Sequence, residues 1–173
     1  IAEDHDKFYL ATIHRAENTD LKNNLKNIID ALEEISKDTP VILPIHPRTK
    51  AKLINYNIVT NKLKLIEPVG YFDMLCLLDR CQAVLTDSGG LQKEAYFSGK
   101  PCITLREETE WTELIDIGAN IGVGAKKDKI IKAIENINTT KIKPKVEIYG
   151  NGNASKRIVD LLSKDLIERE NNV

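Results

Sequence analysis

Short apolar runs and longer amphipathic segments alternate along the chain. Between and after the runs, apolar residues recur every three or four positions, which predicts helices at about 20–35 and at 49–55, 71–78, 91–98, 112–116, 127–138 and beyond 155. Strands that alternate with helices predict an α/β fold, a Rossmann-like doubly wound parallel six-stranded sheet. The six apolar runs predict its buried strands and lie at residues 8–13, 41–45, 63–66, 82–85, 101–105 and 120–123.

The ends of the predicted strands bring polar residues to one edge of the sheet. In the common strand order 3-2-1-4-5-6, strands one and four are neighbours, and a ligand crevice opens at their carboxyl ends. Strand one ends at His14 and Arg15, strand two ends at His46, and strand four ends at residues 87–90. We therefore expect two of the three histidines to face one crevice together with the turn after strand four.

The turn Asp87-Ser88-Gly89-Gly90 is suited to a phosphate. A helix that opens at two glycines leaves its free N–H groups and the positive end of its dipole accessible to an anion. Glu94, about one turn further along, is placed to accept hydrogen bonds from the two hydroxyls of a ribose. The turn predicts half of a nucleotide site. The alternative is a plain strand-to-helix turn in which Ser88 only caps the helix.

Composition argues against several classes of function. The 173 residues carry 25 basic and 26 acidic side chains, which predicts neither a nucleic-acid nor a membrane partner. No apolar run approaches the roughly 18 residues of a membrane span. Three cysteines without a Cys-x-x-Cys pair predict no metal site and indicate a reducing cytoplasm. Because the chain begins with Ile1 rather than Met, we expect it to be a piece of a longer protein.

Cofactor binding is also constrained by the sequence. The first predicted turn lacks the Gly-x-Gly-x-x-Gly fingerprint and reads His14-Arg15-Ala16-Glu17-Asn18 instead. This argues against a nicotinamide or flavin cofactor. It favours a nucleotide that is held by the turn after the fourth strand.

Several motifs in order carry a resemblance to a known family. They are ATIHRAEN at 11–18, IHP at 45–47, TDSGGLQKEA at 86–95, GKP at 99–101, LREETE at 105–110 and YGNGNAS at 149–155. Together they resemble the non-hydrolysing UDP-N-acetylglucosamine 2-epimerases over about residues 8–158. The resemblance implies a two-domain protein of the GT-B type in which this chain is the second domain.

The resemblance also implies an organisation of the chain. Residues 1–148 would be the UDP-binding domain, and residues 149–173 a terminal helix that packs back on a missing N-terminal domain. The full-length protein would be a cytoplasmic homodimer that needs no cofactor.

The reaction and the site residues follow from the same resemblance. The family inverts carbon 2 of the sugar by eliminating UDP to give a glycal and then adding UDP back. His14 matches an active-site histidine, whereas the carboxylates that move the proton belong to the first domain, so the isolated chain is expected to be inactive. The implied substrate-binding residues are Ser88, Gly89 and Gly90 on the diphosphate, Glu94 on the ribose, the loop from Val69 to Met74 beside the uracil, and Arg15 and His46.

Some positions depart from the family pattern. Met74 stands where many members have an aromatic residue, and Ala16 and Lys93 replace an arginine and a glutamate. Residues 110–113, Glu-Trp-Thr-Glu, replace Glu-Arg-Pro-Glu and remove an arginine expected near the substrate. A Glu-Trp sequence resembles relatives that act on UDP-2,3-diacetamido uronic acids, which makes such a sugar an alternative substrate. A GT-B glycosyltransferase and a non-catalytic UDP-sugar binding module are further alternatives.

Three features of the loop after strand five have separate interpretations. Arg106 either pairs with a neighbouring glutamate or faces a phosphate. Trp111 is more typical of an anchor for the helix that follows than of a stacking platform. The pair Glu107-Glu108 indicates a solvated loop rather than an acid/base pair.

Overall fold

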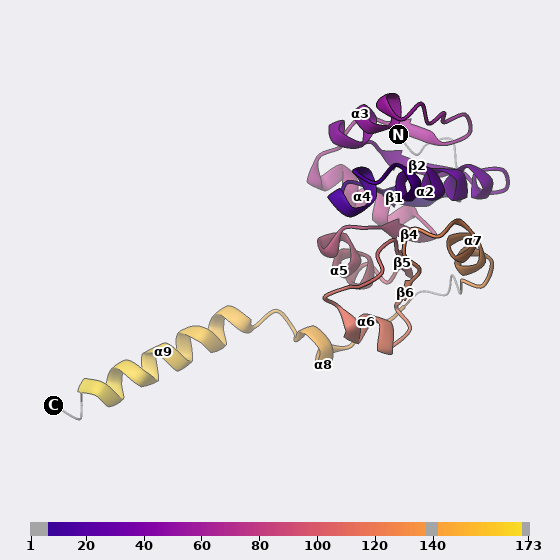
Figure 1. Cartoon of the computed structure of the whole chain (residues 1–173). Helices are drawn as coiled ribbons and strands as arrows, with labels where there is room; N and C mark the ends of the chain where they lie inside the picture. The colour runs from indigo at the N-terminus through magenta and orange to yellow at the C-terminus, as the bar shows by residue number, and fades with distance from the viewer. Residues whose placement is uncertain (1–6, 138–141, 171–173) are drawn as a thin grey trace. The chain divides into compact units, whose positions relative to one another are not determined.

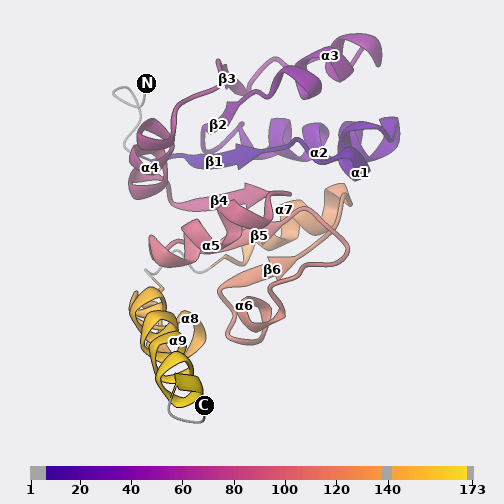
Figure 2. The same cartoon turned by 90° about the vertical axis from the view of Figure 1, so that its left-hand side faces the viewer.

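Six parallel strands form one sheet in a computed structural model that describes residues 7–137 and 142–170 (Figure 1). Their order across the sheet, β3-β2-β1-β4-β5-β6, confirms the sequence prediction. Figure 2 shows β1 and β4 side by side near the middle of the sheet. The strands are β1 (Tyr9–Thr12), β2 (Val41–Pro44), β3 (Lys64–Ile66), β4 (Ala83–Thr86), β5 (Cys102–Thr104) and β6 (Asn120–Gly122).

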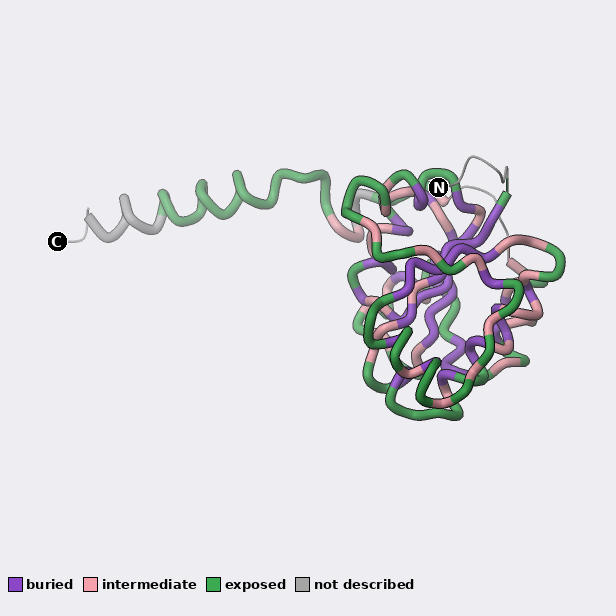
Figure 3. The backbone as a smooth tube through the Cα atoms, turned by 90° about the horizontal axis from the view of Figure 1, so that it is seen from above, coloured by how far each residue is buried: buried purple, intermediate pink, exposed green. Residues whose placement is uncertain are grey.

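Helices cover both faces of the sheet, because successive strand residues point to opposite sides. Ala11 and Leu85 belong to a core shared with α2 (Lys22–Ile35), α3 (Pro47–Asn55) and α7 (Lys127–Glu135). On the other face, residues such as Leu10 and Val84 share a core with α4 (Tyr71–Arg80) and α5 (Gly89–Phe97). The buried residues follow the strands through the interior (Figure 3).

The chain divides into two compact units, Ile1–Ile142 and Lys143–Val173. The second unit contains the short helix α8 (Val146–Tyr149) and the long helix α9 (Ala154–Glu170). None of the helices in the described residues has the length and apolar character needed to cross a membrane. Among the α9 residues whose side chains the structure describes, the large apolar ones Ile158, Val159, Leu161 and Leu162 are exposed.

Several helix boundaries differ from the sequence prediction: α3 begins at Pro47 rather than 49, α4 ends at Arg80 rather than 78, and α5 spans Gly89–Phe97 rather than 91–98. The first long helix begins at Lys22, because residues Ala16–Thr19 form a separate short helix, α1, that the sequence did not reveal. The predicted helix 127–138 ends at Glu135, and its last predicted residue lies outside the described residues. The Lys- and Pro-containing segment 139–146 begins outside the described residues too, and its last residue starts α8.

The register between β1 and β4 brings the residues that follow the two strands together at one edge of the sheet. Thr12 at the end of β1 is paired with Thr86 at the end of β4, and their hydroxyl oxygens are 2.6 Å apart. The residues that follow, His14 on one side and Asp87 on the other, therefore leave the sheet at the same level. Pro44 ends β2, as expected for a residue without an N–H donor.

Candidate functional site

The helix α5 begins at the glycine pair that the sequence singled out. Ser88 is its N-cap, and its hydroxyl accepts a hydrogen bond from the Leu91 N–H at 3.3 Å. The Ser88 N–H donates to Thr86 Oγ1 at 2.9 Å, which fixes the turn to the end of β4. Within the described residues, neither Gly89 nor Gly90 donates its N–H to another group. The capping role of Ser88 and two open donors therefore coexist in this turn.

A cavity of about 300 Å³ opens beside this helix start. It collects residues from the ends of β1 and β2, from the start of α4 and from the first two turns of α5. Seven of the predicted site residues line it: His14, His46, Val69, Met74, Ser88, Gly90 and Glu94. The other lining residues are Thr12, Ile13, Pro44, Pro68 and Leu91.

Gly89 and Arg15 are not among the residues that line this cavity. A Cβ placed on Gly89 would lie 3.6 Å from Arg15 Nη2, 3.5 Å from Trp111 Nε1 and 3.6 Å from Glu110 Oε2. The first residue of α5 therefore faces a guanidinium, an indole and a carboxylate on the side of the helix start toward the loop after β5.

Asp87 is the functional residue to which the sequence assigned no role. Its side chain is fully buried and accepts hydrogen bonds from the backbone N–H groups of His14, at 3.1 Å, and of Arg15, at 3.0 Å. Asn18 Nδ2 donates to the same carboxylate at 3.1 Å and to the Leu105 carbonyl at 2.8 Å. The predicted strand order could have revealed this role. It places Asp87, just after strand four, beside the backbone N–H groups that follow strand one, and these buried donors need an acceptor.

Two histidines lie in the cavity, with ring centroids 6.0 Å apart. His14 is partly exposed, at 39% of its side chain, and its Nδ1 lies 3.5 Å from Asp87 Oδ1. His46 is the N-cap of α3, and its Nδ1 accepts the Arg48 N–H at 3.1 Å. His46 is thus satisfied by the backbone and also lines the cavity.

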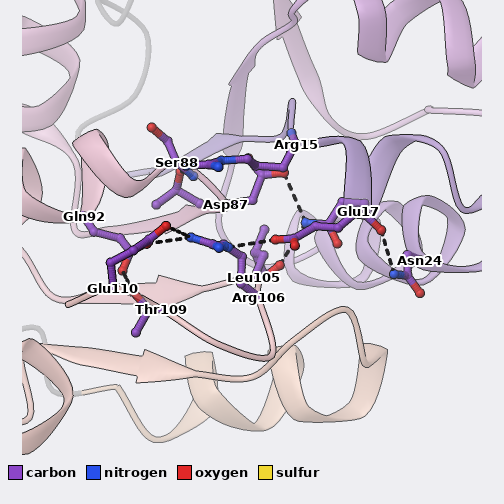
Figure 4. A network of polar contacts seen from close by, with 12 residues as sticks. Arg15, Glu17, Asn24, Asp87, Ser88, Gln92, Leu105, Arg106, Thr109 and Glu110 are labelled. Atoms are coloured by element: carbon purple, nitrogen blue, oxygen red, sulfur yellow. Dashed lines mark hydrogen bonds and ion pairs between the residues drawn. The ribbon is translucent and has the colours of Figure 1, made fainter. Parts of the chain in front are cut away.

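The loop after β5 is held by ion pairs and hydrogen bonds (Figure 4). Arg106, only 14% exposed, donates to Glu17 at 2.7 Å and to Glu110 at 2.7 Å and 3.0 Å, so it pairs with glutamates. Burial alone would lower the pKa of Arg106, but the hydrogen bonds to Glu110 and Glu17 raise it overall. The pKa of Glu110 is lowered by its own backbone N–H and by Arg106.

Trp111 contacts α5 as well as the helix that follows it. Its indole Nε1 donates to the carbonyl oxygen of Gly89 at 2.8 Å, and Lys93 Nζ lies 4.0 Å from its ring centroid. Trp111 is also the N-cap residue of the following helix α6 (Thr112–Asp116), and its carbonyl oxygen accepts the Leu114 N–H at 3.1 Å. The indole contacts α5 in addition.

A cluster of polar side chains also connects the loop after β5 to α5. Thr109 Oγ1 donates to Gln92 Oε1 at 2.8 Å, and Asn120 Nδ2 donates to the same oxygen at 3.1 Å. Gln92 belongs to α5, so the loop is attached to this helix at a second point.

No group of three or more histidine, cysteine, aspartate or glutamate side chains that could hold a metal ion occurs in the part of the chain that the structure describes. The chemistry that the site offers is that of hydrogen-bond donors at a helix start, two imidazoles, and the carboxylate of Glu94 one turn into α5.

Comparison with known proteins identifies the family. A family model described as UDP-N-acetylglucosamine 2-epimerase matches residues 1–163. The chain is 48% identical to a UDP-2,3-diacetamido-2,3-dideoxy-D-glucuronate 2-epimerase of Pseudomonas aeruginosa over 160 residues, which are 92% of this chain and 45% of that protein. It is 46% identical to a UDP-N-acetylglucosamine 2-epimerase of Methanocaldococcus jannaschii over 165 residues, covering 91% of this chain and 45% of that protein.

A solved structure extends the comparison to the fold. The crystal structure of the Methanocaldococcus jannaschii UDP-GlcNAc 2-epimerase in complex with UDP-GlcNAc and UDP superimposes with a TM-score of 0.81 at 44% identity. The match covers 92% of this chain and 46% of that one. The chain thus spans less than half the length of these relatives, as predicted for one of two domains. It belongs to the UDP-N-acetylglucosamine 2-epimerase family.

Proposed function

We propose that this chain is the UDP-binding portion of a UDP-sugar 2-epimerase that acts on UDP-N-acetylglucosamine. One observation carries the proposal: the open start of α5, the Glu94 carboxylate and the His14 imidazole line a single cavity. The relative whose crystal structure holds UDP-GlcNAc and UDP has the same fold, which supports the assignment of a UDP-sugar to this cavity.

Each part of the nucleotide has a matching part of the cavity or of the helix start beside it. The N–H groups of Gly89 and Gly90 and the hydroxyl of Ser88 receive the diphosphate, and the helix dipole favours its charge. Glu94, one turn into α5, accepts hydrogen bonds from the ribose hydroxyls. Val69 and Met74 form the apolar wall for the uracil, and here a thioether takes the place of an aromatic ring.

The remaining residues act on the sugar and on the leaving diphosphate. In the proposed reaction the bond between carbon 1 and the β-phosphate oxygen breaks as the carbon 2 proton leaves. A proton then returns to carbon 2 from the opposite face, and UDP adds back to carbon 1 of the glycal. Negative charge grows on the β-phosphate, and His14 is the catalytic residue that stabilises this charge in its protonated form, by donating a hydrogen bond. His46 and Arg15 bind the substrate from β2 and β1. The acids and bases that move the carbon 2 proton lie on a domain outside this chain, so the chain alone is inactive.

Magnitudes indicate that no single contact suffices. The N-terminus of a helix contributes roughly 0.3–2 kcal/mol toward an anion, whereas micromolar affinity requires about 8 kcal/mol. The binding free energy of UDP is therefore distributed over α5, the two histidines and the apolar residues beside the uracil. This chain alone binds UDP more weakly than the complete protein does.

A second candidate substrate is a UDP-2,3-diacetamido uronic acid. It is favoured by the 48% identity to the Pseudomonas aeruginosa epimerase of that name and by the residues Glu110 and Trp111 next to Gly89. Glycosyl transfer and passive UDP-sugar binding are not favoured by a comparable observation.

The rest of the proposed organisation follows the family. Residues 1–148 form the UDP-binding domain, and residues 149–173 pack on an N-terminal domain through the exposed apolar side chains of α9, such as Leu161 and Leu162. The complete protein is a cytoplasmic homodimer that binds no nucleic acid.

The proposal is tested by titration calorimetry of the chain with UDP, with UMP as the comparison. We expect sub-millimolar binding of UDP, or about −4 kcal/mol and better, and weaker binding of UMP because it lacks the β-phosphate. Glu94→Gln should weaken the binding of both nucleotides, whereas the matched change Glu135→Gln on α7 should weaken the binding of neither. Equal affinities for UDP and UMP, or a Glu94→Gln chain that binds normally, would contradict the assignment.

The choice of sugar is tested on the complete protein that contains this chain. Loss of the carbon 2 hydrogen to deuterated solvent is followed by proton NMR with UDP-N-acetylglucosamine and, in parallel, with the diacetamido uronate. Faster exchange with the uronate would assign the diacetamido uronate as the substrate in place of UDP-N-acetylglucosamine. Exchange with neither sugar would refute the epimerase assignment.

A further inference from the structure

The two cavity histidines have their Nδ1 atoms in opposite surroundings. His46 Nδ1 faces a backbone N–H, that of Arg48, at 3.1 Å. His14 Nδ1 faces a carboxylate oxygen, that of Asp87, at 3.5 Å. A neutral imidazole carries its proton on one nitrogen only, and the neighbour of the other nitrogen decides which one.

The surroundings of His46 fix its tautomer directly. A backbone N–H can only donate, so Nδ1 of His46 must present its lone pair and the proton of the neutral ring lies on Nε2. This hydrogen bond is also the N-cap of α3, and the other tautomer would leave the cap unmade.

Asp87 favours the opposite tautomer in His14. Its carboxylate is fully buried and receives donors from the His14 N–H, the Arg15 N–H and Asn18 Nδ2, so its position is fixed. A separation of 3.5 Å exceeds that of an ordinary N–H···O bond. The electrostatic preference remains, because an N–H dipole directed at a buried carboxylate is attracted to it and a lone pair is repelled.

We infer that the neutral rings of His14 and His46 hold opposite tautomers, with Nδ1–H on His14 and Nε2–H on His46. Asp87 is thereby the positioning residue of His14. The cavity then offers a ligand one imidazole that accepts at Nε2 and one that donates at Nε2, with ring centroids 6.0 Å apart.

The consequence for the reaction rests on the proposed function. With Nδ1–H directed at Asp87, any proton that His14 exchanges with a bound UDP-sugar passes through Nε2. His46 keeps a donor toward the ligand as long as the cap of α3 persists. The two imidazoles therefore have different roles, although both line one cavity.

The test is a long-range proton–nitrogen NMR spectrum of the unliganded chain, labelled with nitrogen-15 in histidine and recorded at a pH where the rings are neutral. His14→Gln and His46→Gln assign the two ring patterns. We expect His14 Nδ1 to resonate as a protonated nitrogen and His14 Nε2 as an unprotonated one, with the reverse for His46. The same tautomer in both rings, or Nε2–H on His14, would overturn the inference.

Asp87→Asn separates positioning from a merely structural role. We expect the His14 pattern to shift toward Nε2–H while the His46 pattern stays unchanged. If the backbone amide spectrum shows a folded chain and the His14 tautomer ratio does not move, Asp87 is not the positioning residue. If this variant does not fold, the wild-type spectrum still decides the tautomers. The measurement needs no nucleotide, so failure to bind UDP would refute the proposed function and leave the tautomer assignment standing.

Discussion

Trp111 donates its indole hydrogen bond to the carbonyl oxygen of Gly89, at 2.8 Å, and so attaches the loop after β5 to the first residue of α5. Gly89 is also where the diphosphate is proposed to bind. The loop that departs from the family pattern at Trp111 and Thr112 thus supports the helix start from the side that does not line the cavity.

Replacing Trp111 with Phe should remove this hydrogen bond and keep an aromatic ring. We expect a loss of about 0.5–1.5 kcal/mol in the free energy of unfolding, measured by urea denaturation. We also expect weaker binding of UDP, because the helix start is less well fixed. Phe72→Leu, a change at an exposed aromatic residue of α4, serves as the control and should affect neither quantity. Unchanged stability in Trp111→Phe would show that the Gly89 contact does not hold the loop.

The glycine at position 90 separates ligand binding from folding. A Cβ there would meet only Ser88 Oγ, at 3.9 Å, so Gly90→Ala should fold normally and gain up to about 1 kcal/mol from helix propensity. Its methyl group would occupy space at the helix start, and we expect UDP affinity to fall by about tenfold or more, a cost of about 1.4 kcal/mol.

Gly118→Ala is the matched control for this change. Gly118 has a φ of 71°, which is unfavourable for alanine, so this variant should lose stability and keep its affinity for UDP. Calorimetry and thermal unfolding of both variants test the pair. Full UDP affinity in Gly90→Ala would contradict the proposal that the diphosphate binds at the start of α5.

Asn18 connects the ends of three strands through one buried amide. Asn18→Ala deletes the donors to Asp87 and to the Leu105 carbonyl and leaves two buried acceptors short of a partner. We expect a loss of about 2–4 kcal/mol, or roughly 4–16 °C in Tm. Asn24→Ala removes an exposed bond to the Glu17 carbonyl and should cost less than about 0.5 kcal/mol. Equal losses in the two variants would contradict the role of Asn18.

Glu110 makes the free energy of unfolding of the chain depend on pH in the acidic range. Its pKa in the folded chain is lowered, first by its own backbone N–H and then by Arg106. The contribution is therefore present above the usual glutamate pKa of about 4.3 and is lost as the pH falls through the lower folded value. Because half of the side chain is exposed, the effect should stay below about 1 kcal/mol.

Urea denaturation at pH 6 and pH 3 measures this dependence. Glu110→Gln should lose less stability than the wild type between the two pH values. Glu108→Gln is the control, because Glu108 makes no ion pair among the described residues. An identical pH dependence in wild type and Glu110→Gln would exclude the contribution.

The three cysteines should differ sharply in reactivity. Burial raises the pKa of Cys81 and of Cys102 to about 12, so at pH 8 both remain protonated and shielded, whereas Cys76 is exposed. A thiol reagent at pH 8 should modify one cysteine per folded chain and three after unfolding in guanidinium. Cys76→Ser should leave no rapidly reacting thiol. Rapid modification of a second cysteine in the folded chain would contradict the burial.

The sheet could be predicted from sequence because its strands are buried on both faces and are therefore continuously apolar. The same reasoning placed His14, His46 and Ser88 at one edge, because the carboxyl ends of parallel strands meet there. Glycine pairs and capping residues are local signals, and the start of α5 was identified from them.

What the sequence did not reveal depends on contacts between distant segments. The helix α1 has no apolar period, and its Asn18 and Thr19 are buried by polar contacts, so no pattern marked it. The direction of the Trp111 indole toward Gly89 is set by how the loop after β5 folds back. Asp87 reads as an ordinary turn residue until its donors are known.

The carboxylate of Asp87 bonds to a backbone group 73 positions earlier in the chain. Such a contact has a large loop-closure cost and forms only when β1 has docked beside β4. The site therefore requires β1 and β4 to be docked, and neither half of the sheet can assemble it alone. A ligand that binds there selects fully folded molecules and slows their escape to partly folded ones, which makes resistance to proteolysis a direct measure of occupancy.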